Sequence, residues 1–433
     1  MNNTKKKSPI SWVPTAYFAM GLPFVVLNMV TVLMFKGLEV DDKLITFWTS
    51  LILLPWTLKP LWSPFLELFR TKKFFVIVTQ LITGVTFGLV AFALNLSHFF
   101  SISIALLAIV AFSGATHDIA CDGVYMSELS NEDQAKFIGW QGAFYNIAKI
   151  LATGGLVYLA GYFIELNADA GLLTANKRAW MIILLILPST QSASSKKTLR
   201  SNKEVMKELG QVLMDFFRKT HITYYICFII LYRFAEGFVM KIVPLFLKAD
   251  REMGGLGLNE KEIGLYYGTY GAAAFVLGSL LAGYYIARRG LKKTIFSLCC
   301  IFNLPFMVYA LFAYFQPESG WIICSGIVFE YFGYGFGFVG LSLFMMQQVA
   351  PGKHQMAHYA FASGIMNFGV MIPGMLSGWV CESLGTWFDK PGGYEPFFIF
   401  VLIATIPAFL ITYFLPFKYD NGGNLLEGEK EYV

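Results

Sequence analysis

The strongest constraint on the fold of this chain is a series of apolar runs that are each long enough to cross a bilayer. A span needs about 20 apolar residues, because a helix rises about 1.5 Å per residue and the hydrocarbon core is roughly 30 Å thick. Only 14% of the residues are charged, whereas soluble domains average about a quarter. Eleven full spans are expected, at residues 12–35, 44–61, 74–96, 99–124, 137–164, 222–247, 263–286, 294–315, 321–348, 356–384 and 397–417. We therefore expect an all-α membrane protein whose surface contacts the lipid bilayer.

One short sixth segment interrupts this series at residues 179–187. Nine helical residues rise only about 14 Å, less than half of the hydrocarbon core. We expect a short helix that begins near Trp180, then a strained or displaced connection and a poorly filled gap beside the fifth span. This expectation follows if the sequence lacks part of a full span through a deletion or a faulty gene model. The alternative is that irregular backbone through residues 188–195 completes the crossing.

A segment rich in Ser, Lys and Arg follows at residues 188–221, which we interpret as a cytoplasmic linker with an amphipathic piece. It divides the chain into an N-terminal helical bundle, residues 1–187, and a C-terminal helical bundle, residues 222–417, with a cytoplasmic tail at residues 418–433. Lys and Arg concentrate on one side of the spans if the N-terminus is cytoplasmic, which predicts a multi-pass protein of the inner membrane with both termini in the cytoplasm.

The two halves also repeat a feature of their connections. A tight turn with a basic cluster follows the second span and recurs after the eighth, and we expect these two turns to act as cytoplasmic gate loops. The repetition predicts two six-helix pseudo-repeats, an organisation typical of secondary transporters, whose binding sites lie where the repeats meet. The predicted gate residues are Glu67, Arg70, Arg288 and Arg289.

Two carboxylates lie at the end of the fourth apolar run. Asp118 and Asp122 are four residues apart, so on a helix they share a face with Gly114 and Tyr125. A carboxylate at membrane depth costs roughly 2.5–3.5 kcal/mol on insertion scales, and such residues face a protein interior or a wet cavity. We interpret Asp118 and Asp122 as proton-coupling residues. The alternative is that they lie past the lipid boundary and end the span.

Two sequence motifs resemble those of a known transporter branch. The turn from Gly283 to Lys293 partly resembles the Gly-x-x-x-Asp-Arg-x-Gly-Arg-Lys loop of the major facilitator superfamily, with Ala287 where the acid usually stands. Lys-Pro-Leu-Trp-Ser-Pro-Phe at 59–65 and Ala-Thr-His-Asp-Ile-Ala-Cys-Asp at 115–122 resemble the AmpG muropeptide permeases, a branch of that superfamily related to the acetyl-CoA transporters. His117 replaces the usual Gln, and Glu67 and Leu68 replace the usual Asp-Arg. The resemblance implies the major facilitator fold and proton-driven import of anhydro-sugar peptides released from the cell wall.

Further polar residues within the spans are candidate substrate contacts. Arg233 suits a carboxylate-bearing ligand because its planar guanidinium binds carboxylates through two parallel hydrogen bonds. Each candidate also has a structural interpretation: Lys149 pairing with Asp118 or Asp122, Arg233 neutralising Glu236 within one helix, and the aromatic and amide groups packing between helices. The candidates are His117, Gln141, Tyr145, Lys149, Arg233, Glu236, Lys241, Glu330, Asn367 and Tyr270.

An enzyme is the less favoured interpretation. His117 and Asp122 have the His-x4-Asp spacing seen in acyltransferases, but five helical residues turn through about 500°, which leaves the two side chains roughly 140° apart. No nucleotide-binding, hydrolase or metalloprotease motif and no paired cysteines occur in the sequence, so we expect no cofactor, no catalytic residue and no metal site. The sequence predicts a monomeric secondary active transporter of muropeptides, with protons and a small-molecule substrate as partners and no nucleic acid. The alternative substrate is another anionic metabolite, such as a sugar or an acyl-CoA-type solute.

Overall fold

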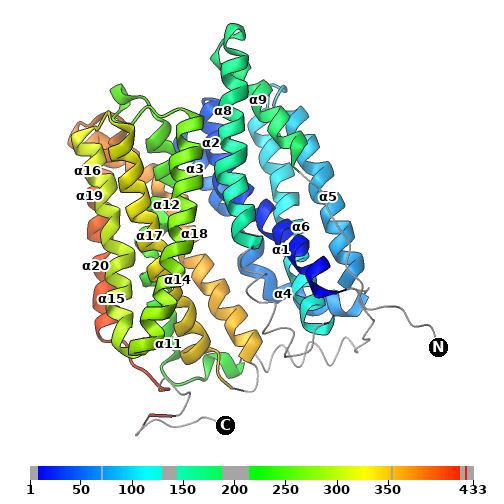
Figure 1. The fold of residues 1–433 in the computed structure, drawn as a ribbon, viewed down its shortest axis with the longest axis vertical. Coiled ribbons are helices and arrows are strands. Elements are labelled where there is room, and N and C mark those ends of the chain that lie inside the picture. Colours follow the sequence, from blue (N-terminus) through cyan, green and yellow to red (C-terminus); the bar gives the residue numbers. More distant parts are fainter. Residues whose placement is uncertain are drawn as a thin grey trace, which may run out of the picture.

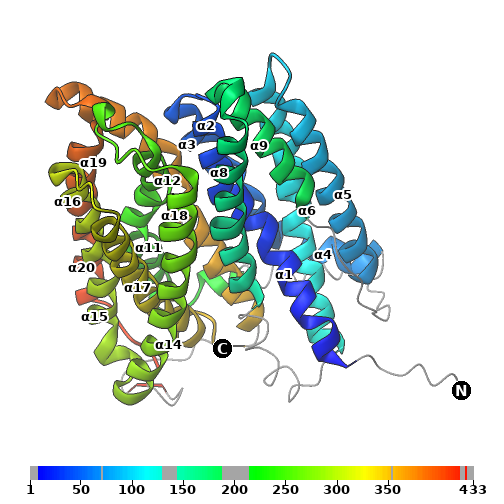
Figure 2. The same ribbon diagram turned by 45° about the horizontal axis from the view of Figure 1, so that its top comes forward.

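The computed structural model describes residues 8–69, 72–128, 144–187, 214–352, 355–419 and 425–426, and the regular elements in this part of the chain are all helices. Helices α1 to α9 gather on one side of the molecule and α11 to α20 on the other (Figures 1 and 2). We call these the N-terminal half, described residues 8–187, and the C-terminal half, described residues 214–419. The chain enters α1 and leaves α20 at the same end, at the bottom of Figure 1. The opposite end, which carries the connections α2–α3, α8–α9 and α12–α13, is called the distal end below.

The N-terminal half consists of long apolar helices with two π-helical turns inserted. Its elements are η1 (Pro9–Ser11), α1 (Val13–Val25), η2 (Val26–Val30), α2 (Thr31–Gly37), α3 (Asp42–Leu51), α4 (Leu54–Phe69), α5 (Lys72–Ala93), α6 (Phe99–Glu128), η3 (Leu151–Leu156), α8 (Val157–Leu166), η4 (Ala168–Ala170) and α9 (Leu172–Ile186). Asp41 begins α3 as its N-cap, because its carboxylate accepts the backbone N–H groups of Lys43 and Leu44. Both π turns, η2 and η3, lie within spans that line the cavity described below.

The C-terminal half has the same character. Its elements are α11 (Ile222–Tyr232), α12 (Phe234–Lys248), η5 (Arg251–Met253), α13 (Glu260–Ile263), η6 (Gly264–Gly271), α14 (Ala272–Arg289), α15 (Leu291–Asn303), η7 (Leu304–Phe306), α16 (Met307–Phe315), α17 (Gly320–Phe344), η8 (Met345–Val349), α18 (Gln355–Phe388), η9 (Pro391–Gly393), α19 (Tyr394–Ala404) and α20 (Ile406–Tyr413). A single residue, Gly290, connects α14 to α15 with φ +81°, a conformation that favours glycine. The tight turn predicted after the eighth span is therefore present.

Among the described residues, nine helices are long and apolar enough to cross a membrane. The two other runs predicted as full spans are each divided into two shorter helices. The run 44–61 breaks between α3 and α4, and the run 222–247 breaks at Arg233, whose φ and ψ of −107° and 7° are not helical. Broken helices are tolerated at membrane depth where the freed backbone is buried in protein or lines a cavity.

The short sixth segment differs from its prediction. The helix α9 begins at Leu172, not near Trp180, and has 15 residues, which corresponds to a rise of about 22 Å. Its polar first turns, with Asn176 and Lys177, hide the start of the helix from a search for apolar runs. Ala175 and Ala179 are buried against Ile164 of α8, so the expected gap beside the fifth span is not found along the described helix. Residues 188–213, which include the predicted connection and most of the linker, lie outside the described residues.

Two seams of small residues join the halves. In the first, α13 and η6 pack on α8 and η3, and the backbone at Gly268 lies directly against the backbone of Thr153 and Gly154. In the second, α18 packs along α3 and α4, with Gly374 against Ser50. Small residues let membrane helices approach closely enough for backbone contact, which replaces the hydrophobic driving force that lipid does not supply.

Polar contacts at the distal end also connect the halves. Lys43 of α3 forms an ion pair of 2.6 Å with Glu382 of α18, and Lys261 pairs with Glu165 of α8. Tyr394 donates a hydrogen bond of 3.3 Å to Asp42. Among the described residues, both ion pairs that join the halves lie at this end. The structure therefore has the two halves closed on each other at the distal end.

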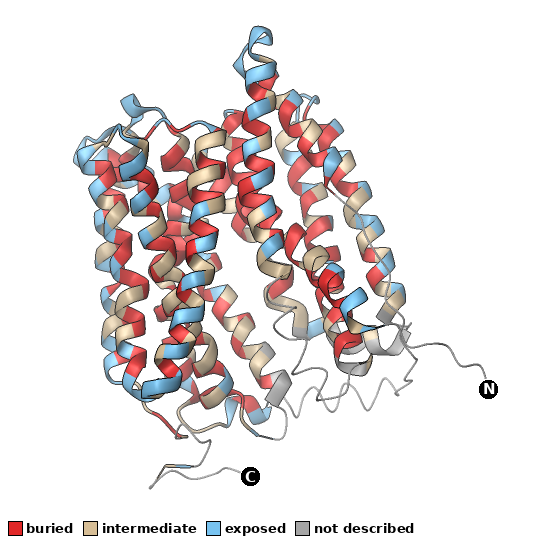
Figure 3. Cartoon of the chain, viewed as in Figure 1, coloured by how far each residue is buried: buried red, intermediate tan, exposed pale blue. Residues whose placement is uncertain are grey.

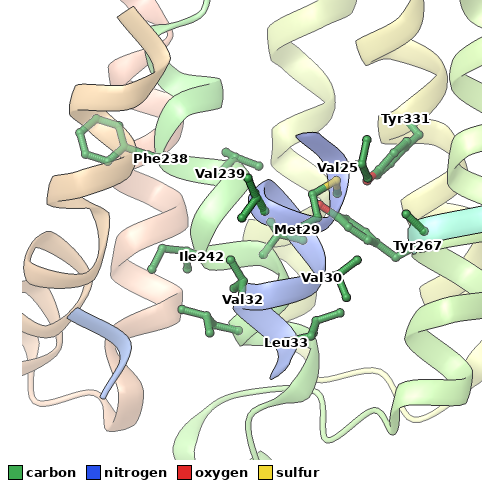
Figure 4. Close-up of a cluster of buried hydrophobic side chains, with 14 of the residues drawn as sticks. Val25, Met29, Val30, Val32, Leu33, Phe238, Val239, Ile242, Tyr267 and Tyr331 are labelled. Carbon is green, nitrogen blue, oxygen red and sulfur yellow. The ribbon is translucent and has the colours of Figure 1, made fainter. Parts of the chain in front are cut away.

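The described surface around the helices is largely apolar and the centre is tightly buried. Exposed residues lie on the outward faces of the helices in Figure 3, and they include large side chains such as Trp321, Phe92 and Tyr413. An apolar outer surface is what a bilayer solvates. Inside, η2 and α2 lie between α12 on one side and two tyrosines of the C-terminal half, Tyr267 and Tyr331, on the other (Figure 4).

The seam at Gly268 gives a first prediction. Gly268→Ala places a methyl group against the backbone of the other half, so the halves must separate locally; we expect a destabilisation of about 1–3 kcal/mol, as for other overpacked sites. The measurement is thermal unfolding in detergent. Gly283→Ala is the matched control, because no atom beyond its chain neighbours and its own helix backbone lies within 4 Å of the added methyl group there, and its melting temperature should equal or exceed that of the wild type, since Ala favours a helix more than Gly does. Equal melting temperatures for all three proteins would contradict the assigned contact.

Candidate functional site

A cavity of about 390 Å³ lies between the halves and is lined by both of them. This size is within the range of small-molecule sites. Its wall contains four cations and three carboxylates among the described residues, so it has one excess positive charge when all of them are ionised. They are Lys59, Lys149, Arg233, Lys241, Asp118, Glu236 and Glu330.

Asp118 is the carboxylate of the N-terminal half, on α6. Its Oδ2 accepts hydrogen bonds from Trp56 Nε1 at 2.7 Å and from Lys59 Nζ at 2.6 Å, both on α4, whereas its Oδ1 is buried with no partner among the described residues. Gly114 lies one turn before Asp118, and the absence of a side chain there leaves room for the Trp56 ring. Lys59 and Trp56 were not among the predicted site residues, although Lys59 begins the motif at residues 59–65. A lone lysine three residues after a tryptophan in an apolar run is the signal that points to both.

Asp122 lies on the same face one turn further along α6 but contacts a different helix. Tyr17 of α1 donates a hydrogen bond of 2.9 Å to its Oδ1, and the rings of Tyr17 and Tyr125 meet edge to face at 5.8 Å. The predicted stripe on α6 therefore faces α4 at one end and α1 at the other. Asp122 does not line the cavity.

His117 points away from the cavity. Its ring lies 3.1 Å from Gln80 Nε2 on α5 and against Cys121, and it is 3% exposed. Side chains of adjacent helical residues point about 100° apart, so His117 faces a different helix from Asp118. His117 and Asp122 have separate partners, as the helical geometry predicted for this pair.

The carboxylates of the C-terminal half are held by neighbours in the same half. Arg233, at the break between α11 and α12, binds Glu236 through two hydrogen bonds of 2.5 Å, from Nε and Nη2, and both residues are buried. Glu330 of α17 accepts a hydrogen bond of 2.9 Å from Tyr309 of α16. The structural interpretation of the Arg233–Glu236 spacing is therefore present in the structure, and both residues also line the cavity.

Lys149 comes from the N-terminal half but its ammonium lies among aromatic rings of the other half. Its Nζ is 4.4 Å from the ring centre of Phe275, 5.5 Å from that of Tyr334 and 5.6 Å from that of Tyr331. Of the two interpretations left open for Lys149, the structural pairing with Asp118 or Asp122 is not found among the described residues, because Lys59 and Tyr17 bind those carboxylates. The rings supply a cation–π environment instead.

Lys241 joins the two halves through hydrogen bonds. This residue of α12 is 2% exposed, and its Nζ donates to Oδ1 and to the backbone oxygen of Asn28 at 2.8 and 3.0 Å. Asn28 lies in the π turn η2 of the other half, where wider backbone geometry presents its carbonyl oxygen. This contact could not be predicted from the sequence, because no sequence pattern connects residues so far apart.

The other predicted residues fall into three groups. Tyr145 and Asn367 line the cavity, whereas Tyr270 is 45% exposed on η6 and is absent from the cavity wall. Arg288 and Arg289 end α14, with the Arg289 guanidinium 5.4 Å from the ring centre of Tyr285. Gln141, Arg70 and the side chain of Glu67 lie outside the described residues.

Comparisons with known proteins agree with this architecture. The family model of the Major Facilitator Superfamily matches residues 15–349, and a second match covers residues 225–430. Among curated proteins, the anhydromuropeptide permease of Escherichia coli K12 is 21% identical over 399 residues, covering 91% of this chain and 77% of the relative. The putative transporter AmpG 1 of Rickettsia bellii is 22% identical over 380 residues, covering 84% of this chain and 87% of that protein.

Solved structures show the same fold. The crystal structure of the nucleoside transporter NupG superposes with a TM-score of 0.62 at 13% identity, covering 93% of this chain and 98% of that one. The crystal structure of a D-xylose-proton symporter superposes with a TM-score of 0.66 at 11% identity, covering 97% of this chain and 100% of the other.

The Arg233–Glu236 pair gives the second prediction. Arg233→Gln leaves Glu236 buried without its cation, so we expect a loss of about 3–5 kcal/mol of stability, and Glu236→Gln should cost a similar amount. The double variant removes both charges and should recover most of the loss. Thermal unfolding in detergent measures all three proteins. Additive losses in the double variant would show that the two side chains do not stabilise each other.

Proposed function

Because this chain belongs to the major facilitator superfamily, in its AmpG-like branch, we propose that it imports cell-wall-derived muropeptides in symport with protons. The observation that supports this most directly is the charged cavity between the halves, which has one excess positive charge and an aromatic wall. The chain is a multi-pass membrane transporter of small molecules by family. The substrate, the coupling ion and the orientation are the proposed part.

The cavity wall suits an amino sugar that bears a peptide. Tyrosine and tryptophan rings stack on the faces of sugar rings, and Phe24, Trp56, Tyr267 and Tyr331 all line the cavity. The excess positive charge favours a ligand with more carboxylates than amines, as in muropeptides with free peptide carboxyl groups. Tyr145, Asn146 and Asn367 are in place for hydroxyl and amide groups.

Asp118 is the proposed proton carrier. It lines the cavity, it is buried, and one of its two oxygens has no hydrogen-bond partner among the described residues. A buried carboxylate at membrane depth takes up or releases a proton when the charges around it change. Asp122, held by Tyr17 one turn away, is the proposed second titrating group.

The proposed cycle is alternating access by two helical bundles, residues 1–187 and 222–417, which rock about the cavity. Residues 188–221 form the linker, residues 418–433 the tail, and the protein acts as a monomer. The positive-inside distribution places both termini in the cytoplasm and the distal end in the periplasm. Closure by the Lys43–Glu382 and Lys261–Glu165 pairs then corresponds to a state that is shut towards the periplasm.

Transport by the purified protein tests the function. Proteoliposomes with an inward proton gradient should accumulate a labelled anhydromuropeptide, and collapse of the gradient should stop accumulation. A panel with a neutral disaccharide, a free sugar acid and an acyl-CoA distinguishes the substrate classes. Uptake of acyl-CoA without uptake of muropeptide would replace the proposed substrate, and turnover of any solute without transport would indicate an enzyme.

Asp118→Asn tests the proton coupling. The amide cannot exchange a proton, so gradient-driven accumulation should be lost, while exchange of labelled for unlabelled muropeptide across the membrane should persist. Asp169→Asn, in the exposed connection before α9, is the matched control and should accumulate like the wild type. Accumulation by Asp118→Asn with unchanged pH dependence would place the coupling elsewhere.

Lys149→Gln tests the proposed charge of the substrate. Loss of this ammonium removes the excess positive charge of the cavity, so we expect affinity for an acidic muropeptide to fall roughly tenfold or more. The same muropeptide with its carboxyl groups amidated should lose much less. Binding measured by isothermal calorimetry gives both values, and an equal loss for the two ligands would indicate a packing role within the aromatic rings.

A further inference from the structure

The Lys59–Asp118 pair faces the cavity, and the Lys59 side chain is the more exposed of the two. The side chain of Lys59 is 26% exposed and that of Asp118 7%, and both residues line the cavity. We propose that Lys59 is shared between Asp118 and the substrate: a proton on Asp118 frees the Lys59 ammonium to bind a carboxylate of the ligand. This inference rests on the proposed function and identifies Lys59 as a specificity-determining residue for it.

The hydrogen bonds show why the pair can separate. Asp118 Oδ2 accepts both Lys59 Nζ and Trp56 Nε1, so the carboxyl group keeps the indole N–H as a partner when the ammonium leaves. Oδ1 has no partner among the described residues and is the atom left to take the proton. Lys59 has three N–H donors and, among the described residues, gives one of them to Asp118, which leaves two for an oxygen anion in the cavity.

The charges of Lys59 and Asp118 link the binding of a proton to the binding of a substrate carboxylate. With Asp118 ionised, Lys59 is neutralised and the cavity wall near it does not attract an anion. With Asp118 protonated, Lys59 is a partly buried cation that has lost its hydrogen-bonded carboxylate and keeps only the more distant charge of Asp122, an arrangement that is costly until an anion arrives. Proton and carboxylate therefore bind together, one of each, and leave together.

In the part of the chain that the structure describes, no other charged group is hydrogen-bonded to either member of the pair. The titratable groups that interact with this pair from the surrounding helices are Asp122, Cys121 and His117 of α6 and Tyr145 of the fifth span. Tyr17 of α1 already binds Asp122, and His117 faces Gln80 of α5. The three remaining cavity cations lie with other partners: Lys149 among aromatic rings, Arg233 on Glu236 and Lys241 on Asn28.

The first experiment needs no knowledge of the natural substrate. Asp118→Asn imitates the protonated acid and leaves Lys59 free, so acetate should bind there and raise the melting temperature of this variant by roughly 2 °C or more over chloride at equal ionic strength. The double variant Asp118→Asn with Lys59→Gln lacks the ammonium and should show no acetate effect. The wild type and the Asp169→Asn control should also show none. Equal acetate shifts in the single and double variants would overturn the proposal, whatever the transporter carries.

The second experiment uses the proposed substrate. Wild-type binding of an acidic anhydromuropeptide should take up one proton, measured by calorimetry in buffers of different ionisation enthalpy, and should weaken as the pH rises. Lys59→Gln should abolish proton uptake and flatten this pH dependence, Lys59→Arg should keep both, and Lys149→Gln should weaken binding while the proton uptake remains. Proton uptake that persists in Lys59→Gln would overturn the shared-lysine proposal, whereas failure of the wild type to bind any muropeptide would overturn the proposed function instead.

Discussion

A carboxylate within the hydrocarbon of a bilayer needs a proton or a hydrogen-bonding partner, and the interior of this protein follows from that constraint. Asp118 has Lys59 and Trp56, Glu236 has Arg233, and Glu330 has Tyr309. Each group of partners comes from helices of one half, so these three cavity acids are each satisfied within their own half. The cations that lack an acid partner among these pairs, Lys149 and Lys241, are the ones that reach across to the other half.

The helix break and the π turns lie at the cavity and at the seam, where polar groups of the two halves meet. The break at Arg233 frees backbone at the level of the cavity, and the π turn η2 turns the carbonyl of Asn28 towards Lys241. The π turns η3 and η6 meet at the seam between the halves, where Gly268 allows backbone contact with Thr153. Regular helices would satisfy their own backbone fully and offer none of these contacts. The same irregularities that cost helix stability therefore build the cavity and the junction.

The sequence predicted most of the helices, because an apolar run of about 20 residues leaves few alternatives in a bilayer. It failed where the pattern is not one of hydrophobicity: α9 begins in the polar residues before Ala179, and the breaks at Ile52 and Arg233 lie inside runs that are apolar on both sides. The stripe of Asp118 and Asp122 followed from helical spacing alone. Its partners did not, since periodicity gives the face of a helix but not the neighbour that covers it. For the same reason the sequence left open whether Lys149 pairs with one of these acids or faces the cavity.

Contacts within one half differ from contacts between the halves in what happens to them during transport. If one half rocks against the other, Lys59–Asp118 and Arg233–Glu236 move as units, because both members of each pair lie in the same half. Lys241–Asn28, Lys43–Glu382 and the seam at Gly268 join different halves and have to break when the distal end opens. The Lys241 ammonium then loses its hydrogen bonds to Asn28, and its positive charge lies next to the cavity without these acceptors. An anionic ligand that neutralises this charge stabilises the opened distal end, so the contact that locks one state favours binding in the other.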